Sequence, residues 1–517
     1  MTEELTKDQP LDIHGKPFNR GIVLALILIA TFGGMLMQTS LGTAMPTLMN
    51  DFNISLATGQ QATTWFLLAN GIMVPVSAYL TTKIPTKYLY MVAYTLLLAG
   101  MATTAFTPSH HDMWWMFLLG RILAAVAVGI TMPLMQVVMV NIFPAEQRGA
   151  AMGINGIVIG LAPAIGPTLS GWILEKNHHL FGLLISNSWR TIFYLPMIVL
   201  VLVWIATPFF VKNVVPNRDM KLDFPSLILA VIGFGSFLWG FSNSATDGFG
   251  NWPNVLAPIL VGILVIIVFV FRKLKMDDPF LNVRVFKNKQ FTLTTFAVMM
   301  AMMAMMGVEM MLPTYLQNVH GMSALESGLT LLPGALVIGA MSPVAGAVYD
   351  KVGAKRMAMV GFSILAIGTV PFLFLTAETP QHLVTLLYAL RMFGIATTMM
   401  PLTASAMSAL PPEEASQATA ANNTVRQIGN AVVVALLSSV TQNVIKAAKP
   451  AKDLAKENVV SYMDKMINAT MTGFHASFAF GIGFAVVGII LAFFLHSGKL
   501  VHGKSNGNVV ADKGGNN

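Results

Sequence analysis

The sequence predicts an all-α integral membrane protein with fourteen transmembrane helices. Three observations support this prediction: an apolar composition, many apolar runs of spanning length, and an uneven distribution of positive charge. Of the 517 residues, 55% are hydrophobic and only 10% are charged, whereas about a quarter of a typical soluble domain is charged. Roughly 20 apolar residues in a helix cross the hydrocarbon core of a bilayer. The predicted spans lie near 21–45, 62–82, 88–106, 115–141, 152–174, 191–211, 226–243, 254–272, 292–316, 328–348, 357–376, 383–408, 425–442 and 473–496.

The positive charges predict how the helices are oriented. With a cytoplasmic N-terminus, most of the 31 Lys and Arg lie in inner loops and tails, as the positive-inside rule requires. Fourteen spans then place both termini in the cytoplasm. The polar, acidic start of the chain is unlike a cleavable signal peptide, so we expect it to remain as a tail. The net charge of +8 therefore reflects topology, and no nucleic-acid partner is expected.

The chain repeats itself at offsets of 267 to 270 residues. Residues 45–47, Met-Pro-Thr, recur as Leu-Pro-Thr at 312–314; residues 71–83 align with 339–351, and Arg121 aligns with Arg391. Two copies of a six-helix unit explain three matches at nearly one offset. Parallel repeats of this kind are typical of transporters that rock two halves about a central site.

This duplication predicts the organisation of the chain. We expect a cytoplasmic tail (1–20), a six-helix bundle (21–211), an inserted peripheral helix pair that fills space between the halves, with its loops (212–290), a second six-helix bundle (291–497) and a second cytoplasmic tail (498–517). Within the second bundle we expect an extracellular loop at 443–470. The outer segment 441–470 alternates Lys and apolar residues, and we expect an amphipathic surface helix within it.

Glu309 is an acid inside one of the most apolar stretches of the chain. The other 22 of the 23 Asp and Glu fall in tails, loops or the ends of apolar runs. A charged side chain at the centre of a membrane helix costs roughly 2.5–3.5 kcal/mol, so such a residue is a candidate for function. The rise per residue of an α-helix places Glu309 about 10 Å below the outer surface of the membrane. The alternative is a helix-end acid satisfied by neighbouring hydroxyl groups.

The loop after the tenth predicted span carries a family signature. Residues 346–356 read GAVYDKVGAKR, in which glycines permit close approach and tight turning, and the charged residues pair or anchor the inner face. The pattern resembles the loop signature of the major facilitator superfamily. By this resemblance, the cytoplasmic gate loop comprises Lys83, Gly346, Asp350, Lys351, Gly353 and Arg356. The first copy departs from the pattern, with Thr82 in place of the acid and Pro85 in place of a glycine.

The fifth predicted span is rich in glycine and proline. Its glycines form a helix face without bulky side chains, and its prolines bend the helix. A helix that only packs closely against its neighbours would need the same residues. Its Gly-Pro-x-x-Ser-Gly ending resembles the antiporter signature of the same superfamily, which implies export. The residues of this motif are Gly156, Gly160, Pro163, Gly166, Pro167 and Gly171.

The fourteen spans, the antiporter-like fifth span and the segment 312–321 together resemble the fourteen-helix drug:proton antiporter branch, which includes bacterial multidrug and lincomycin-type exporters. The segment 120–129 resembles the fourth-helix motif that bears an arginine, here Arg121, although an Arg that snorkels to the surface is the alternative. The segment 36–46 resembles the first-span pattern of the branch. Met37 and Gln38 stand where many relatives carry Asp, so a first-span acid for cationic drugs is absent.

The resemblance implies a proton-coupled efflux transporter of amphipathic drugs or toxic small molecules, in a bacterial plasma membrane. We expect a monomer with no cofactor beyond the coupling proton. Our hypothesis is that Glu309 takes a proton from outside and releases it inward, with release driven by substrate or by Arg121. Candidate substrate-binding residues have polar or polarizable side chains within spans: Gln38, Trp65, Asn70, Gln136, Asn155, Met306 and Met310. Buried amides that only pair with neighbouring helices are the alternative.

Other functions are less well supported by the sequence. A transporter of a metabolite, siderophore, peptide or amino acid on the same fold is the first alternative. A membrane enzyme is not favoured, because no His, Asp and Glu cluster has metal-ligand spacing and the chain has no cysteine. Residues 498–505 match the sequence pattern of a phosphate-binding loop. The strand that precedes such a loop and the helix that follows it are not predicted here, so we expect a basic tail. A channel or receptor is the last alternative.

Overall fold

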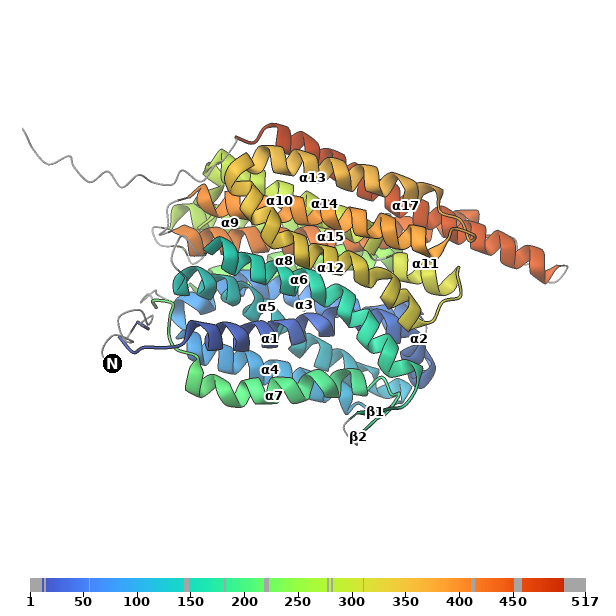
Figure 1. Cartoon of the computed structure of the whole chain (residues 1–517), viewed down its shortest axis with the longest axis horizontal. Helices are drawn as coiled ribbons and strands as arrows, with labels where there is room; N and C mark the ends of the chain where they lie inside the picture. The colour runs from blue at the N-terminus through green and yellow to red at the C-terminus, as the bar shows by residue number, and fades with distance from the viewer. Residues whose placement is uncertain are drawn as a thin grey trace, which may run out of the picture.

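The computed structural model describes residues 12–496 apart from 14, 55, 144–147, 181–182, 218–222, 277–278, 280–281, 310, 411–413 and 451–457. Long helices run side by side along one axis of the molecule (Figure 1). The described strands form one small antiparallel hairpin of β1 (His178–Leu180) and β2 (Leu183–Ile185). The predicted all-α membrane fold is therefore confirmed.

The first half of the chain forms one helical bundle with its own hydrophobic core, which draws on residues 18–215. Its helices are α1 (Arg20–Thr39), α2 (Leu41–Phe52), α3 (Leu56–Lys83), α4 (Thr86–Ala105), α5 (Trp114–Ile142), α6 (Arg148–Glu175) and α7 (Thr191–Phe210). The predicted first span is broken at Ser40, where α1 ends and α2 begins.

The second half forms another bundle around a separate core of residues 297–495. Its helices are α10 (Lys289–Glu309), α11 (Leu312–Asn318), α12 (Ala324–Val352), α13 (Ala354–Thr369), α14 (Gln381–Ser408), α15 (Ala415–Ala448) and α17 (Val459–Phe493). The chain breaks between α10 and α11, much as it does between α1 and α2.

Two inserted helices, α8 (Phe224–Asp247) and α9 (Ala257–Lys275), pack against each other and against both halves. An apolar cluster joins Tyr79 of α3, Phe234 of α8, Phe269 of α9 and Phe291 of α10. The inserted pair therefore bridges the two bundles at this position, as expected of a pair that fills space between the halves.

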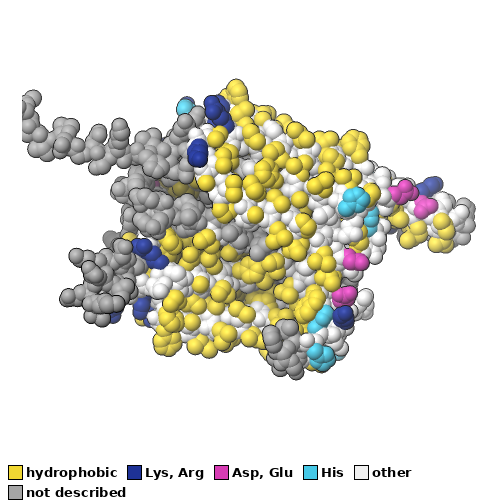
Figure 2. All heavy atoms as spheres, in the orientation of Figure 1, with side chains coloured by type: hydrophobic (Ala, Val, Ile, Leu, Met, Phe, Trp, Pro, Cys, Tyr) yellow, Lys and Arg dark blue, Asp and Glu magenta, His cyan; other side chains and the backbone are white. Residues whose placement is uncertain are grey.

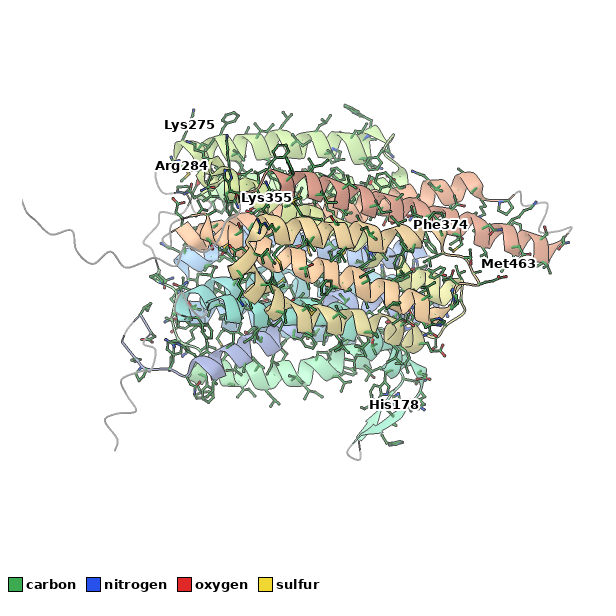
Figure 3. All side chains as sticks on the ribbon, turned by 45° about the horizontal axis from the view of Figure 1, so that its top comes forward. His178, Lys275, Arg284, Lys355, Phe374 and Met463 are labelled. Atoms are coloured by element: carbon green, nitrogen blue, oxygen red, sulfur yellow. The ribbon has the colours of Figure 1, made fainter. Side chains whose placement is uncertain are left out.

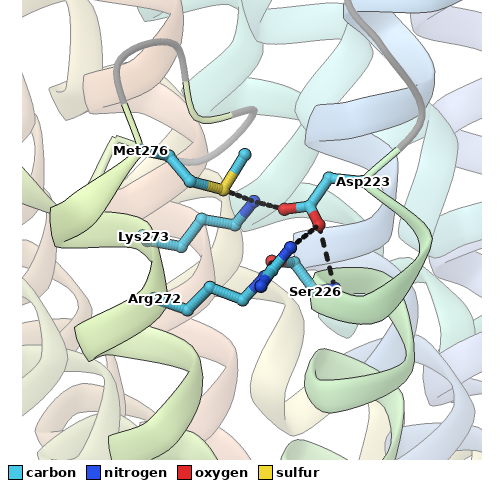
Figure 4. A network of polar contacts seen from close by, with 5 residues as sticks. All are labelled: Asp223, Ser226, Arg272, Lys273 and Met276. Atoms are coloured by element: carbon cyan, nitrogen blue, oxygen red, sulfur yellow. Dashed lines mark hydrogen bonds and ion pairs between the residues drawn. The ribbon is translucent and has the colours of Figure 1, made fainter.

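A polar network fastens α8 to α9 (Figure 4). The carboxylate of Asp223, just before α8, accepts hydrogen bonds from Arg272 Nη2 at 2.9 Å, Lys273 Nζ at 2.8 Å and the Ser226 amide at 3.3 Å. Burial raises the pKa of Asp223, but the hydrogen bonds from Lys273, Ser226 and Arg272 outweigh burial and hold that pKa well below its usual range. The carboxylate therefore stays charged at neutral pH.

Twelve helical segments in the described part of the chain are long and apolar enough to cross a membrane. Helices α3 and α6 have 28 residues each, and they are not among the twelve. The number of fourteen spans therefore stays a prediction.

The two ends of the molecule carry different charges. In the view of Figure 2, Lys and Arg gather at one end, Asp, Glu and His lie mainly at the other, and the band between them is apolar. Lys275, Arg284 and Lys355 mark the first end, called the basic end, and His178, Phe374 and Met463 mark the far end (Figure 3).

Helix α17 extends beyond its neighbours at the far end (Figure 1). With 34 and 35 residues, α15 and α17 are each about 50 Å long, against about 30 Å for the hydrocarbon core. The surface helix expected within 441–470 is wrong, because α15 continues straight to Ala448 and α17 already begins at Val459.

Candidate functional site

Two arginines hold equivalent helices of the two halves in the same way. Arg121 of α5 donates from Nη1 to the backbone carbonyl of Met37 on α1. Arg391 of α14 donates from Nη2 to the carbonyl of Ala304 on α10, at 3.0 Å. Met37 and Ala304 are 267 residues apart, the offset of the repeated Pro-Thr segments.

Both guanidinium groups are buried. Arg121 is 1% exposed and lies 4.4 Å from the centroid of the Phe66 ring, while Arg391 is 0% exposed and also donates from Nε to Thr369 Oγ1 at 2.8 Å. Neither arginine reaches the surface, so the snorkelling alternative for Arg121 is wrong. Each keeps at least one buried nitrogen without a hydrogen-bond partner among the described residues.

Glu309 is the last residue of α10, and its Oε2 atom is buried without a hydrogen-bond partner in the described part of the chain. The neighbouring hydroxyl groups that could satisfy this atom are therefore not observed to do so. Arg391 and Tyr388 of α14 interact with its charge. An uncompensated oxygen in such a setting is costly unless it can take up a proton or a ligand.

In this structure Arg391 is the cation whose charge acts on Glu309. The role expected of Arg121 in proton coupling stays a prediction. Helix rise predicted similar depths for Glu309 and Arg121. Depth alone does not say which bundle a residue faces. Arg121 is tied to α1 in the first bundle, whereas α10 and α14 pack together in the second.

Amide side chains connect the two halves directly. Gln427 of α15 donates from Nε2 to the side-chain oxygen Oδ1 of Asn70 on α3, at 3.0 Å. Asn423 of α15 donates from Nδ2 to the side-chain oxygen Oε1 of Gln136 on α5, at 2.9 Å. We call Asn70, Gln136, Asn423 and Gln427 the amide row. It lies where two rocking halves would separate, so its hydrogen bonds can be exchanged for bonds to a substrate.

The sequence interpretation missed the α15 members of this row. The predicted span begins at 425, which leaves Asn423 outside it and puts Arg426 at its inner edge. In the structure α15 begins at Ala415. The signal was the spacing of Asn423, Gln427 and Asn430 at intervals of four and three, which puts them on one helix face.

The other predicted binding residues make no described hydrogen bond to the amide row or cannot be placed. Trp65 contacts Trp239 of the inserted helix α8, with ring centroids 5.0 Å apart. Gln38 and Met306 are half-buried, on α1 and α10. Met310 lies outside the described residues, as does the side chain of Asn155.

Helix α6, which carries the antiporter motif, approaches helices of both halves closely. A side chain on Gly166 would collide with Thr39 of α1, and a Cβ on Gly328 of α12 would lie 2.6 Å from Thr168 Cα. Pro167 and Gly171 are buried. The side chain of Pro163 and the surroundings of Gly156 and Gly160 lie outside what the structure describes. The described half of the motif therefore serves close packing.

The predicted gate loop lies at the basic end, between α12 and α13. Gly353 has φ of 85°, the left-handed conformation expected of a tight turn. Lys83, Lys351 and Arg356 are exposed, and the Asp350 side chain is not among those described. The close approach predicted at Gly346 is wrong, because a Cβ there would meet nothing within 4 Å.

Comparison with known proteins gives the family. Residues 27–434 match the family model of the Major Facilitator Superfamily. The chain is 39% identical to the uncharacterized MFS-type transporter YcnB of Bacillus subtilis and 36% identical to the lincomycin resistance protein LmrB of the same organism; each match covers 93% of this chain and 96% of the relative.

A solved structure has the same fold. The proton:xylose symporter XylE matches with a TM-score of 0.57 at 14% sequence identity, covering 92% of this chain and 96% of that one. This match at low identity shows the fold alone. The relatives are transporters, so the enzyme alternative is excluded. The chain belongs to the Major Facilitator Superfamily of membrane transporters.

Proposed function

We propose that this transporter exports amphipathic small molecules in exchange for protons, with Glu309 as the proton-binding group. The observation that carries the proposal is the buried Oε2 atom of Glu309, which has no partner among the described residues and lies near Arg391. An ionisable residue in a membrane helix marks a functional site by default. The lincomycin resistance of the relative LmrB supports export.

Coupling follows from differential interaction between two states of the transporter. When Glu309 is charged, Arg391 attracts it and favours the present arrangement of α10 and α14. When Glu309 is protonated, this attraction is lost and the balance shifts to the other state. The halves then rock about the centre, and the amide row opens to release or admit substrate.

The test is transport of lincomycin and a dye panel by the full chain in proteoliposomes under an imposed pH gradient. Replacing Glu309→Gln keeps the size of the side chain but removes the titratable group. We expect this variant to lose acceleration by the gradient while it still exchanges substrate across the membrane at equal pH.

Glu378→Gln is the matched control, because Glu378 is an exposed acid four residues after Phe374, which marks the far end. It should behave as wild type. Gradient-driven transport by Glu309→Gln at the wild-type rate would contradict the assignment of Glu309. Accumulation of the compounds by cells that express the protein, instead of resistance to them, would contradict export and favour a metabolite importer.

A further inference from the structure

Arg426 of α15 is a buried cation without a described partner. It is 8% exposed, and none of the described residues accepts a hydrogen bond from it or forms an ion pair with it. Arg121 and Arg391 differ from it, since both donate to backbone carbonyls. A guanidinium in a membrane helix is costly, so it faces a water-filled cavity, a partner or a ligand.

Helical spacing shows which way Arg426 faces. Successive residues turn by about 100° in an α-helix. Asn423, three residues earlier, contacts α5 of the first half, and a Cβ on Gly429, three residues later, would collide with Met299 of α10. Arg426 lies about 60° from each of them. It is therefore turned toward the space between the first bundle and α10.

Arg426 lies near the middle of the bundle. The next residue, Gln427, bonds to Asn70, which is the fifteenth of the 28 residues of α3. Glu309 lies much closer to the far end, ten residues or about 15 Å beyond Met299 along α10. The two charged sites are separate.

Other unsatisfied donors lie at this level. The Asn422 amide nitrogen is buried without a described partner, and so is the Thr295 hydroxyl of α10. Thr295 lies one turn before Met299 on the same face, and α10 and α15 run in the same direction from the basic end. A guanidinium, an amide and a hydroxyl at one depth offer donors to an anion.

We infer that Arg426, together with Asn422 and Thr295, forms a subsite for an anionic group, a carboxylate or a phosphate, on the transported molecule. This inference rests on the proposed function, because it takes the space between the halves as the substrate path. A guanidinium forms paired hydrogen bonds with either group. The absence of a first-span acid, with Met37 and Gln38 in its place, agrees with a site that does not select cations.

The test uses the full chain in lipid nanodiscs and two probes of the same shape, 2-naphthoxyacetic acid and its neutral amide. Calorimetry should show that wild type binds the acid at least tenfold more tightly than the amide, since a hydrogen-bonded charge contributes at that level. Arg426→Gln should lose this preference, and Arg426→Lys should keep part of it. Lys446→Gln removes an exposed charge from the same helix and should behave as wild type.

Phenylglyoxal modification gives a second readout that does not need the variants to fold. The acid, but not the amide, should protect Arg426, as located by peptide mass spectrometry. Equal binding of the two probes, no binding of the acid, or no protection of Arg426 would overturn the inference. Lincomycin export driven by the pH gradient is a separate measurement, so failure of the anion subsite and failure of proton-coupled export can be told apart.

Discussion

Arg391 is the residue on which the second bundle depends most directly. It joins α14 to Ala304 of α10 and to Thr369, and it lies 5.6 Å from the centroid of the Phe372 ring. We expect Arg391→Gln to lower the free energy of unfolding by about 1.5–3 kcal/mol, because it removes charged hydrogen bonds inside the bundle. Denaturation of the purified protein in detergent measures this change.

Arg391→Lys should fall between wild type and Arg391→Gln, since an ammonium cannot reach both acceptors with the geometry of a guanidinium. Lys465→Gln, at an exposed position of α17, serves as the control. Unchanged unfolding of Arg391→Gln would show that the bond to Ala304 contributes no stability.

Some residues of the site could be predicted from the sequence, because each is of an unusual type for its position in the chain. Glu309 is an acid in an apolar run, and Arg121 and Arg391 match across the repeat. The cation beside Glu309 could not be predicted, since pairing depends on which bundle each helix joins. Asn423 and Arg426 were missed because polar residues at a helix start lower the local hydropathy and shift the apparent boundary.

At the scale of elements, the junction of α8 and α9 depends on one carboxylate. Lys273 has a fully buried side chain and bonds to Asp223, whose side chain is 7% exposed. We expect Asp223→Asn to cost about 3 kcal/mol of stability, because it leaves a buried ammonium without its counter-ion. Thermal or chemical unfolding measures the loss.

This contribution also has a defined pH dependence. The pKa of Asp223 lies below its usual range, so the stability it provides is fully present above the ordinary carboxyl value of about 4 and is lost as the pH falls further. Wild type and Asp223→Asn should differ by a constant amount between pH 6 and 8 and should converge in acid. A gap that closes already near neutral pH would contradict the assignment.

The contact of α6 with α12 is the other critical junction between elements. A side chain at Gly328 has no room against Thr168. Gly328→Val should push α6 and α12 apart at the far end and slow transport at least tenfold, while Gly483→Val, at a position of α17 with open space, should change transport little. Transport by Gly328→Val at the wild-type rate would show that this contact opens freely during the cycle.

The helices themselves were largely predictable, because apolar runs of spanning length have few other stable forms in a membrane. Their interruptions were not. The first and ninth predicted spans each divide in two, at Ser40 and after Glu309, and neither break carries a strong composition signal.

At the scale of the whole molecule, the segregation of charge predicts sidedness. The chain has no cysteine, so single cysteines report on one position each. In intact cells a membrane-impermeant maleimide should label a cysteine at Val460, which is 71% exposed at the far end, and should not label one at Lys16 near the basic end. Lys16→Cys should become reactive after permeabilisation. Labelling in the reverse pattern would invert the topology, and with it the direction of transport.

The matching hydrogen bonds from Arg121 to Met37 and from Arg391 to Ala304 also bear on how the two halves are related. A contact made by matching atoms in both copies is most simply inherited from a single half-length ancestor. Glu309 aligns with Gly42 in the repeat, so this acid is present in one copy only. The two halves therefore share a common frame, while the acid proposed to bind the proton belongs to one of them alone.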